Sequence, residues 1–143
     1  MKRPAAIAAT MALAAVSLAG CGGGNAYCDA VQADQDTLNA FGKTRTNEAY
    51  ADYVTTFETI AKVAPESVSG DWKKLAEVTQ DVLTTQDEAG VALEDMTDTE
   101  KVAGLTQAQL ADLNEAYEAF NGTTDQREAV VANVSSECDI KLS

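Results

Sequence analysis

Apolar residues recur at intervals of three and four along almost the whole chain, and this spacing most restricts what the chain can fold into. The clearest stripe lies over residues 47–64 and contains Tyr50, Tyr53, Val54, Phe57, Ile60, Ala61 and Ala64. Side chains spaced in this way share one face of an α-helix, whereas those of a half-buried strand alternate at every second residue. We find no convincing strand pattern and no internal repeat, so the sequence predicts an all-α domain.

The same pattern, read with helix start and stop signals, predicts four to five helices. They cover residues 26–41, 47–64, 71–89 and 106–121, and Asp125 with Glu128 is expected to cap a last helix. Residues 66–70 are expected to form a separate turn before an N-cap at Asp71, and Thr106 with Gln109 has the pattern of a capping box. The last helix places Val130, Val131, Val134 and Cys138 on one face. Residues 90–105 are irregular, with one short helical piece that starts at Thr97 and ends at Gly104.

The first twenty residues have the features of an export signal rather than of a folded segment. Lys2 and Arg3 precede an apolar stretch at 5–16 that is too short to span a bilayer. The following Leu-Ala-Gly-Cys sequence resembles a bacterial lipobox, which predicts cleavage between Gly20 and Cys21 and a lipid on Cys21. An ordinary secretory signal with an incidental cysteine is the alternative.

This division separates the chain into three parts. Residues 1–20 are a lipoprotein signal peptide that is removed, residues 21–25 are the lipidated cysteine and a flexible tether, and residues 26–143 are one α-helical domain. The acyl chains on Cys21 are then the expected membrane anchor, and the predicted location is extracytoplasmic, at the outer face of the bacterial cell membrane.

Cys28 and Cys138 lie near opposite ends of the domain. Export places them in an oxidising compartment, where an even number of cysteines most simply forms disulfides. We therefore expect a Cys28–Cys138 disulfide, with two free thiols as the alternative.

This disulfide restricts the topology. Five helices of similar length that alternate in direction would leave the two cysteines at opposite ends of the bundle, whereas a disulfide needs Cα atoms within about 7 Å. The sequence therefore predicts a helical bundle with one long crossover at about 90–105 that runs the length of the bundle.

The charge balance excludes several classes of function. The chain has 10 Lys and Arg against 23 Asp and Glu and no histidine, and its net charge of −13 becomes −15 without Lys2 and Arg3. Phosphate backbones are bound by clusters of basic residues, so no nucleic-acid partner is expected. Without imidazole, the common histidine-dependent triads and zinc sites are excluded. No motif places a nucleophile beside a base, so we expect no enzyme, no catalytic residues and no cofactor.

Some aromatic and acidic residues have both a functional and a structural interpretation. Tyr50 and Tyr53, with Phe57, can line a ligand groove or a contact surface, but this spacing is more typical of a core. Trp72 is a candidate anchor for a partner, with a buried position at the end of the bundle as the alternative. The acidic residues of the irregular segment, which are Asp95, Asp98 and Glu100, do not match a known calcium loop, so we expect a solvated acidic surface and no metal site.

The chain resembles a diffuse group of small actinobacterial lipoproteins. The motifs that carry the resemblance are the lipobox at Cys21, Tyr27-Cys28, Ala64-Pro65-Glu66, Asp71-Trp72, Ala89-Gly90-Val91 and Glu137-Cys138-Asp139-Ile140. The resemblance covers nearly the whole mature chain and implies an α-helical extracytoplasmic domain closed by Cys28–Cys138, but no functional residues. Asp139 stands where the group usually has glycine, so the resemblance does not imply a shared terminal turn.

These observations lead to two functional hypotheses. The first is a non-catalytic module, anchored by its lipid, that binds a protein of the cell envelope. The second is a carrier of a small molecule or lipid with a cavity between its helices, for which we expect an apolar cavity of about 300 Å³ or more. A hydrolase is a third and more distant hypothesis.

Overall fold

The computed structural model describes residues 25–143, and all regular structure within that range is helical. The predicted signal peptide, the predicted cleavage site at Gly20 and Cys21, the predicted lipidation of Cys21 and most of the predicted tether lie outside the described residues. The helices are α1 (Ala26–Ala33), α2 (Gln35–Ala40), α3 (Asn47–Val63), α4 (Glu66–Ala89), η1 (Leu93–Asp95), α5 (Thr99–Ala103), α6 (Gln107–Asn121) and α7 (Thr124–Cys138). The all-α prediction is confirmed.

The predicted first helix is divided in two at Asp34. This residue ends α1 and precedes α2, with φ −105° and ψ 15°, outside the regular helical range. Aspartate has a low intrinsic preference for the helix interior, so a break costs little at this position, although the Asp34 side chain makes no capping bond here. Tyr27 and Val31 of α1 and Leu38 of α2 are nonetheless all buried, so the break bends the stripe without removing it from the core.

The predicted turn at 66–70 is wrong, because α4 begins at Glu66 and runs without interruption. Pro65 ends α3, since it lacks the backbone N–H that would continue the helix, and it precedes the first turn of α4. Val68 is buried one helical turn before Trp72. Burial of Val68 thus extends the apolar stripe across Gly70, which the sequence alone marked as a break.

Three smaller predictions also need correction. The last helix starts at Thr124, one residue before the expected cap at Asp125. Only Gly122 and Thr123 separate it from α6. Val131 does not share the buried face of Val130 and Val134, and 41% of its surface is exposed. The short helix α5 is capped by the Asp98 side chain rather than by Thr97.

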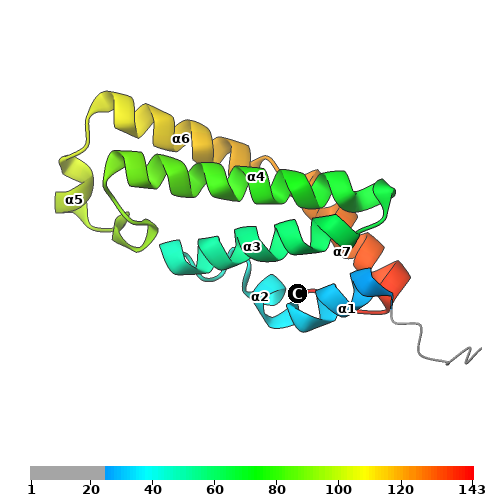
Figure 1. Ribbon diagram of the computed structural model, residues 1–143. Coiled ribbons are helices and arrows are strands. Elements are labelled where there is room, and N and C mark those ends of the chain that lie inside the picture. Colours follow the sequence, from blue (N-terminus) through cyan, green and yellow to red (C-terminus); the bar gives the residue numbers. More distant parts are fainter. Residues whose placement is uncertain (1–24) are drawn as a thin grey trace, which may run out of the picture.

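The helices form a bundle in which α4 lies between α3 on one side and α6 with α7 on the other (Figure 1). Within residues 25–143, none of the helices combines the length and the apolar character that crossing a bilayer requires. Figure 1 also shows α1 and the end of α7 at the same end of the bundle, where the Cys28–Cys138 disulfide joins them.

The long connection at 90–105 is present between α4 and α6, but its route differs from the one expected. The Gln109 side-chain nitrogen donates to the Ala89 carbonyl at 3.3 Å, so the connection leaves and returns at the same end of the bundle. The helices α6 and α7 instead follow one another along α4. Two successive helices that run in the same general direction thereby bring Cys138 back to Cys28.

A glycine inside α4 and the glycine that follows it provide a matched pair of predictions. Gly90 ends the helix in the left-handed conformation at φ 71°, whereas Gly70 lies inside the helix with nothing within 4 Å of an added Cβ. We expect Gly90→Ala to lower the free energy of unfolding by about 1–2 kcal/mol. Gly70→Ala should raise it by about 0.5–1 kcal/mol, because alanine loses less backbone entropy in a helix. Urea denaturation of both variants measures the two changes in the free energy of unfolding. Changes of the same sign in the two variants would contradict the assigned helix end.

Candidate functional site

The aromatic residues singled out as candidates for binding lie in the core. The exposed fractions of Tyr50, Tyr53 and Trp72 are 0%, 1% and 1%. The Trp72 indole nitrogen donates to the Tyr27 hydroxyl at 3.2 Å, and the Tyr53 hydroxyl donates to the Ala40 carbonyl at 2.7 Å. Burial raises the pKa of the Tyr27 and Tyr53 phenols. A partner contact at Tyr50, Tyr53 or Trp72 therefore has no exposed surface on which to form, and these side chains pack the bundle instead.

The disulfide is formed as predicted. Cys28 and Cys138 are bonded, with their Cα atoms 5.3 Å apart and a separation of 110 positions in sequence. The segment after Cys138 folds back along α2, where the Gln35 side chain donates to the Lys141 carbonyl at 3.2 Å and the Asn39 side chain accepts from the Ser143 amide at 2.8 Å. The disulfide thus fastens both terminal segments to one another at one end of the bundle.

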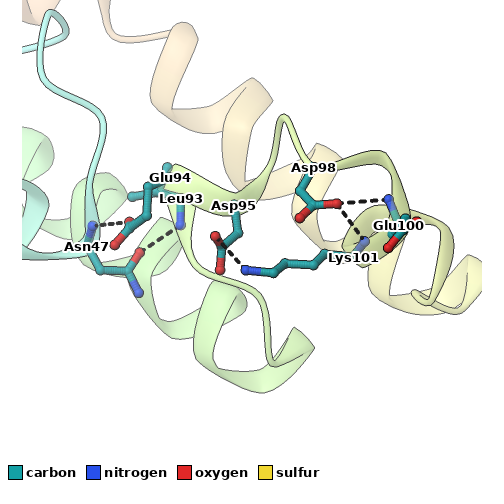
Figure 2. A network of polar contacts seen from close by, with 7 residues as sticks. All are labelled: Asn47, Leu93, Glu94, Asp95, Asp98, Glu100 and Lys101. Atoms are coloured by element: carbon teal, nitrogen blue, oxygen red, sulfur yellow. Dashed lines mark hydrogen bonds and ion pairs between the residues drawn. The ribbon is translucent and has the colours of Figure 1, made fainter.

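The acidic segment between α4 and α6 is held by internal contacts (Figure 2). The Asp95 carboxylate pairs with the Lys101 ammonium at 2.7 Å. The Asp98 carboxylate accepts from the backbone amides of Glu100 and Lys101, at 3.0 and 3.3 Å, and so caps α5. Hydrogen bonding to Asp95 is the main cause that raises the pKa of Lys101.

These contacts bear on calcium binding at the same residues. Asp95 faces an ammonium group and Asp98 faces backbone donors, so neither carboxylate is directed toward a shared ion position. Within residues 25–143, no group of three or more His, Cys, Asp or Glu residues is arranged to hold a metal ion. The contacts of these carboxylates instead join η1 to α5 and cap α5.

A reciprocal contact attaches this segment to the start of α3. The Asn47 side-chain oxygen accepts from the Leu93 amide at 2.9 Å, while the Asn47 amide donates to the Glu94 carboxylate at 3.0 Å (Figure 2). The Glu94 carboxylate also lies at the N-terminus of α3, where the helix dipole favours negative charge. Leu93 is buried beside these bonds, so Asn47 fixes the position of an apolar residue as well as a turn.

We expect Asn47→Ala to lower the free energy of unfolding by about 1 kcal/mol, because it removes the acceptor of the Leu93 amide. Hydrogen exchange should accelerate at residues 93–96 and remain unchanged in the centre of α4. Thr55→Ala on the exposed side of α3 is the matched control. Unchanged exchange at Leu93 in Asn47→Ala would show that the contact does not hold the segment.

An open groove with a volume of about 510 Å³ lies between α3 and α4. We call it the α3–α4 groove. Its floor contains Ala61 of α3 and Ala76 of α4, both of which are 6% exposed. Because both side chains are small, a third helix could pack close to the backbones of α3 and α4 at this position. The groove thus has the shape of a site for an added helix rather than of an enclosed ligand cavity.

Basic and acidic side chains that border the α3–α4 groove are distributed unequally along its length. Lys62 lies at the end next to the turn between the two helices, and Lys73 and Glu58 follow. Glu77 and Asp81 lie further along α4, with Asp81 about 12 Å beyond Lys73 at 1.5 Å per residue. One end of the groove is therefore more basic and the other is acidic, which fixes the direction of a charged helix that enters it.

Two other hollows differ from the α3–α4 groove in their volume and in the side chains that line them. One of about 420 Å³ lies beside the 90–105 connection and is bordered by polar and charged residues that include Arg45 and Glu94. A hollow with mostly apolar walls lies between α2, α4 and α7 and has about 180 Å³. This apolar volume is below the roughly 300 Å³ expected of a carrier.

The α3–α4 groove was not among the sites predicted from the sequence. The apolar spacing over residues 47–64 predicts a buried position for Ala61, whereas no pattern in the sequence marks Ala76. The sequence feature that could have indicated this groove is an alanine on each of the two helices with charged residues about one turn away. That signal becomes specific only when α3 and α4 are known to pack side by side.

Together these features define a class: an all-α domain closed by one terminal disulfide, with a tightly packed aromatic core and an open groove between its two longest helices. No protein-family model matches the chain, and no curated protein or solved structure matches it.

Proposed function

We propose that this protein is a non-catalytic, lipid-anchored module of the bacterial cell envelope that binds another envelope protein through the α3–α4 groove. The observation that carries the proposal is the groove itself, with its alanine floor and its charged borders. The partner element that fits this site is a helix with small residues on one face. Its acidic end would lie near Lys62 and its basic end near Asp81.

The proposed location rests on the N-terminal sequence. A charged start, an apolar stretch and the lipobox ending at Cys21 support export and lipidation, and the resemblance to small actinobacterial lipoproteins agrees with both. A disulfide in the domain is compatible with an oxidising compartment. The membrane is then contacted through the lipid on Cys21, while the acidic domain stays away from anionic headgroups.

The shape of the hollows favours protein binding over transport of a lipid. A carrier must enclose most of its cargo, whereas the α3–α4 groove is open and bordered by charged side chains. The bundle interior is filled by the aromatic core. Binding by surface complementarity is therefore the activity that needs the least rearrangement of this fold.

Site-specific photo-crosslinking in the native envelope tests the contact site. We expect a crosslinker at Gln80, on the border of the α3–α4 groove, to give one defined protein adduct, and a crosslinker at Glu128 of α7 to give none. The adduct should disappear when Lys62→Glu and Lys73→Glu are combined, since both basic groups of the groove then repel the partner's acidic end. Adducts of equal yield at both positions, or an adduct that survives the charge reversal, would reject this site.

Membrane fractionation tests the anchor separately. Cys21→Ser should move the protein from the membrane fraction to the soluble extracytoplasmic fraction, because the acyl chains are the proposed attachment. A Cys21→Ser protein that remains in the membrane fraction would contradict lipid anchoring without bearing on the groove.

A further inference from the structure

The apolar hollow between α2, α4 and α7 has a second property that the proposed function does not use. It has a volume of about 180 Å³, and its apolar wall includes Phe41, Phe57, Trp72, Val130 and Leu142. We call this hollow the Arg127 crevice, because the Arg127 side chain also lines it. Cavities of about 150 Å³ with apolar walls hold a single benzene ring, so the crevice has room for a ligand of that size.

Arg127 is held rigidly at the edge of the crevice. Its Nε donates to the Thr123 hydroxyl oxygen at 3.0 Å, and its Nη2 donates to the Phe120 carbonyl at 2.9 Å. The guanidinium carbon lies 5.0 Å from the centre of the Phe41 ring and 4.8 Å from that of Phe120. These contacts use two of the five N–H donors of the guanidinium, so others remain available to a ligand.

Within residues 25–143, Arg127 forms no ion pair with an Asp or Glu side chain, although the domain is strongly acidic. All 23 Asp and Glu residues lie within residues 25–143, and the ion pairs there are Lys74–Glu77 and Lys101–Asp95. The Arg127 side chain is partly buried. Burial lowers the pKa of the guanidinium, yet arginine stays charged under ordinary conditions. A partly buried cation that pairs with none of the Asp and Glu side chains of residues 25–143 is the feature that most favours an external anion.

We propose that the Arg127 crevice binds a small monocarboxylate, whose carboxylate pairs with Arg127 and whose apolar body, about the size of one benzene ring, occupies the crevice. The guanidinium fork matches the two oxygens of a carboxylate. One guanidinium neutralises one negative charge, so a phosphate dianion would leave excess negative charge in an already acidic domain. The size of the crevice excludes a long acyl chain. This inference is independent of the protein contact proposed for the α3–α4 groove.

The single tryptophan of the chain makes the crevice directly observable. Trp72 lies in its wall, so ligand entry should change the Trp72 fluorescence and the NMR resonance of its indole N–H. The protein for this experiment is the full-length chain with Cys21→Ser, exported so that the disulfide forms, because detergent micelles would absorb an apolar probe. The probes are hexanoate and 1-hexanol, which share an apolar chain and differ in charge.

We expect hexanoate to bind saturably with a Kd of about 1 mM or below, and 1-hexanol to bind about tenfold more weakly because it lacks the charge. Arg127→Gln should weaken hexanoate binding about tenfold. Lys74→Gln, which removes an exposed cation of α4 that does not line the crevice, is the matched control and should leave the affinity unchanged.

Two further variants keep the inference open to rejection if Arg127→Gln fails to fold. Arg127→Lys retains the charge but not the fork and should give an intermediate affinity. Val131→Phe adds volume at a residue that lines the crevice and is 41% exposed, so it should block hexanoate without unfolding the protein. No saturable response of Trp72 to hexanoate, equal binding of 1-hexanol, or full affinity in Val131→Phe would each overturn the proposed site.

Discussion

Replacing Cys28 and Cys138 together with serine is expected to lower the free energy of unfolding by about 4–5 kcal/mol. The disulfide closes a segment of 110 residues, and in the chain-entropy model such a long closure removes much of the freedom of the unfolded chain. The double variant avoids an unpaired thiol. Urea denaturation should give a lower midpoint, together with a steeper dependence on urea because the unfolded chain becomes less compact.

The matched control for this variant is Cys21→Ser, which removes a cysteine that does not take part in the disulfide. The exported Cys21→Ser protein should have the same urea midpoint as the protein that keeps Cys21 but carries no lipid. If the double variant loses less than about 1 kcal/mol, residual contacts between the segments that form α1 and α7 already restrict the unfolded chain. The disulfide would then be a minor contributor to stability.

Trp72→Ala is expected to lower the free energy of unfolding by about 3–5 kcal/mol. The Trp72 side chain is 1% exposed and packs against Phe57, with ring centres 5.8 Å apart. Its removal leaves a cavity and leaves the buried Tyr27 hydroxyl without its indole donor. Thermal and urea denaturation measure the loss. Trp72→Phe keeps most of the volume and should cost clearly less.

This prediction also separates a core residue from a contact residue. Val131→Ala changes a residue that is 41% exposed and should alter stability by less than about 0.5 kcal/mol. A Trp72→Ala protein of nearly unchanged stability that loses its partner would instead indicate an exposed anchor. That result would contradict the buried position of Trp72.

Local chemistry accounts for the parts of the fold that were predicted correctly. Gly42 and Gly90 have positive φ where the sequence predicted helix ends, and Thr106 with Gln109 forms the predicted capping box. Such signals involve residues within one helical turn of each other and need no knowledge of the rest of the chain. They fail where packing competes with them, as at Gly70, where burial of Val68 and Trp72 keeps α4 continuous.

The start of α7 shows the same competition between local and tertiary effects. Asp125 with Glu128 has a capping pattern, but the helix starts before it. The Thr123 hydroxyl, which is next to the helix start, donates backward to the Phe120 carbonyl at 2.7 Å and accepts from Arg127. The junction of α6 and α7 is therefore organised around Arg127 rather than around a side-chain cap of α7. This arrangement also places Arg127 at the crevice.

The amino-acid sequence alone determined the all-α class, most helix ends and the Cys28–Cys138 disulfide, because each depends on periodicity, local backbone preference or compartment. Tertiary structure decided the route of the chain, in which α6 and α7 follow one another along α4 while the 90–105 connection stays at one end. It also decided both candidate sites. The α3–α4 groove and the Arg127 crevice join residues from different helices, and sequence spacing does not state which helices become neighbours.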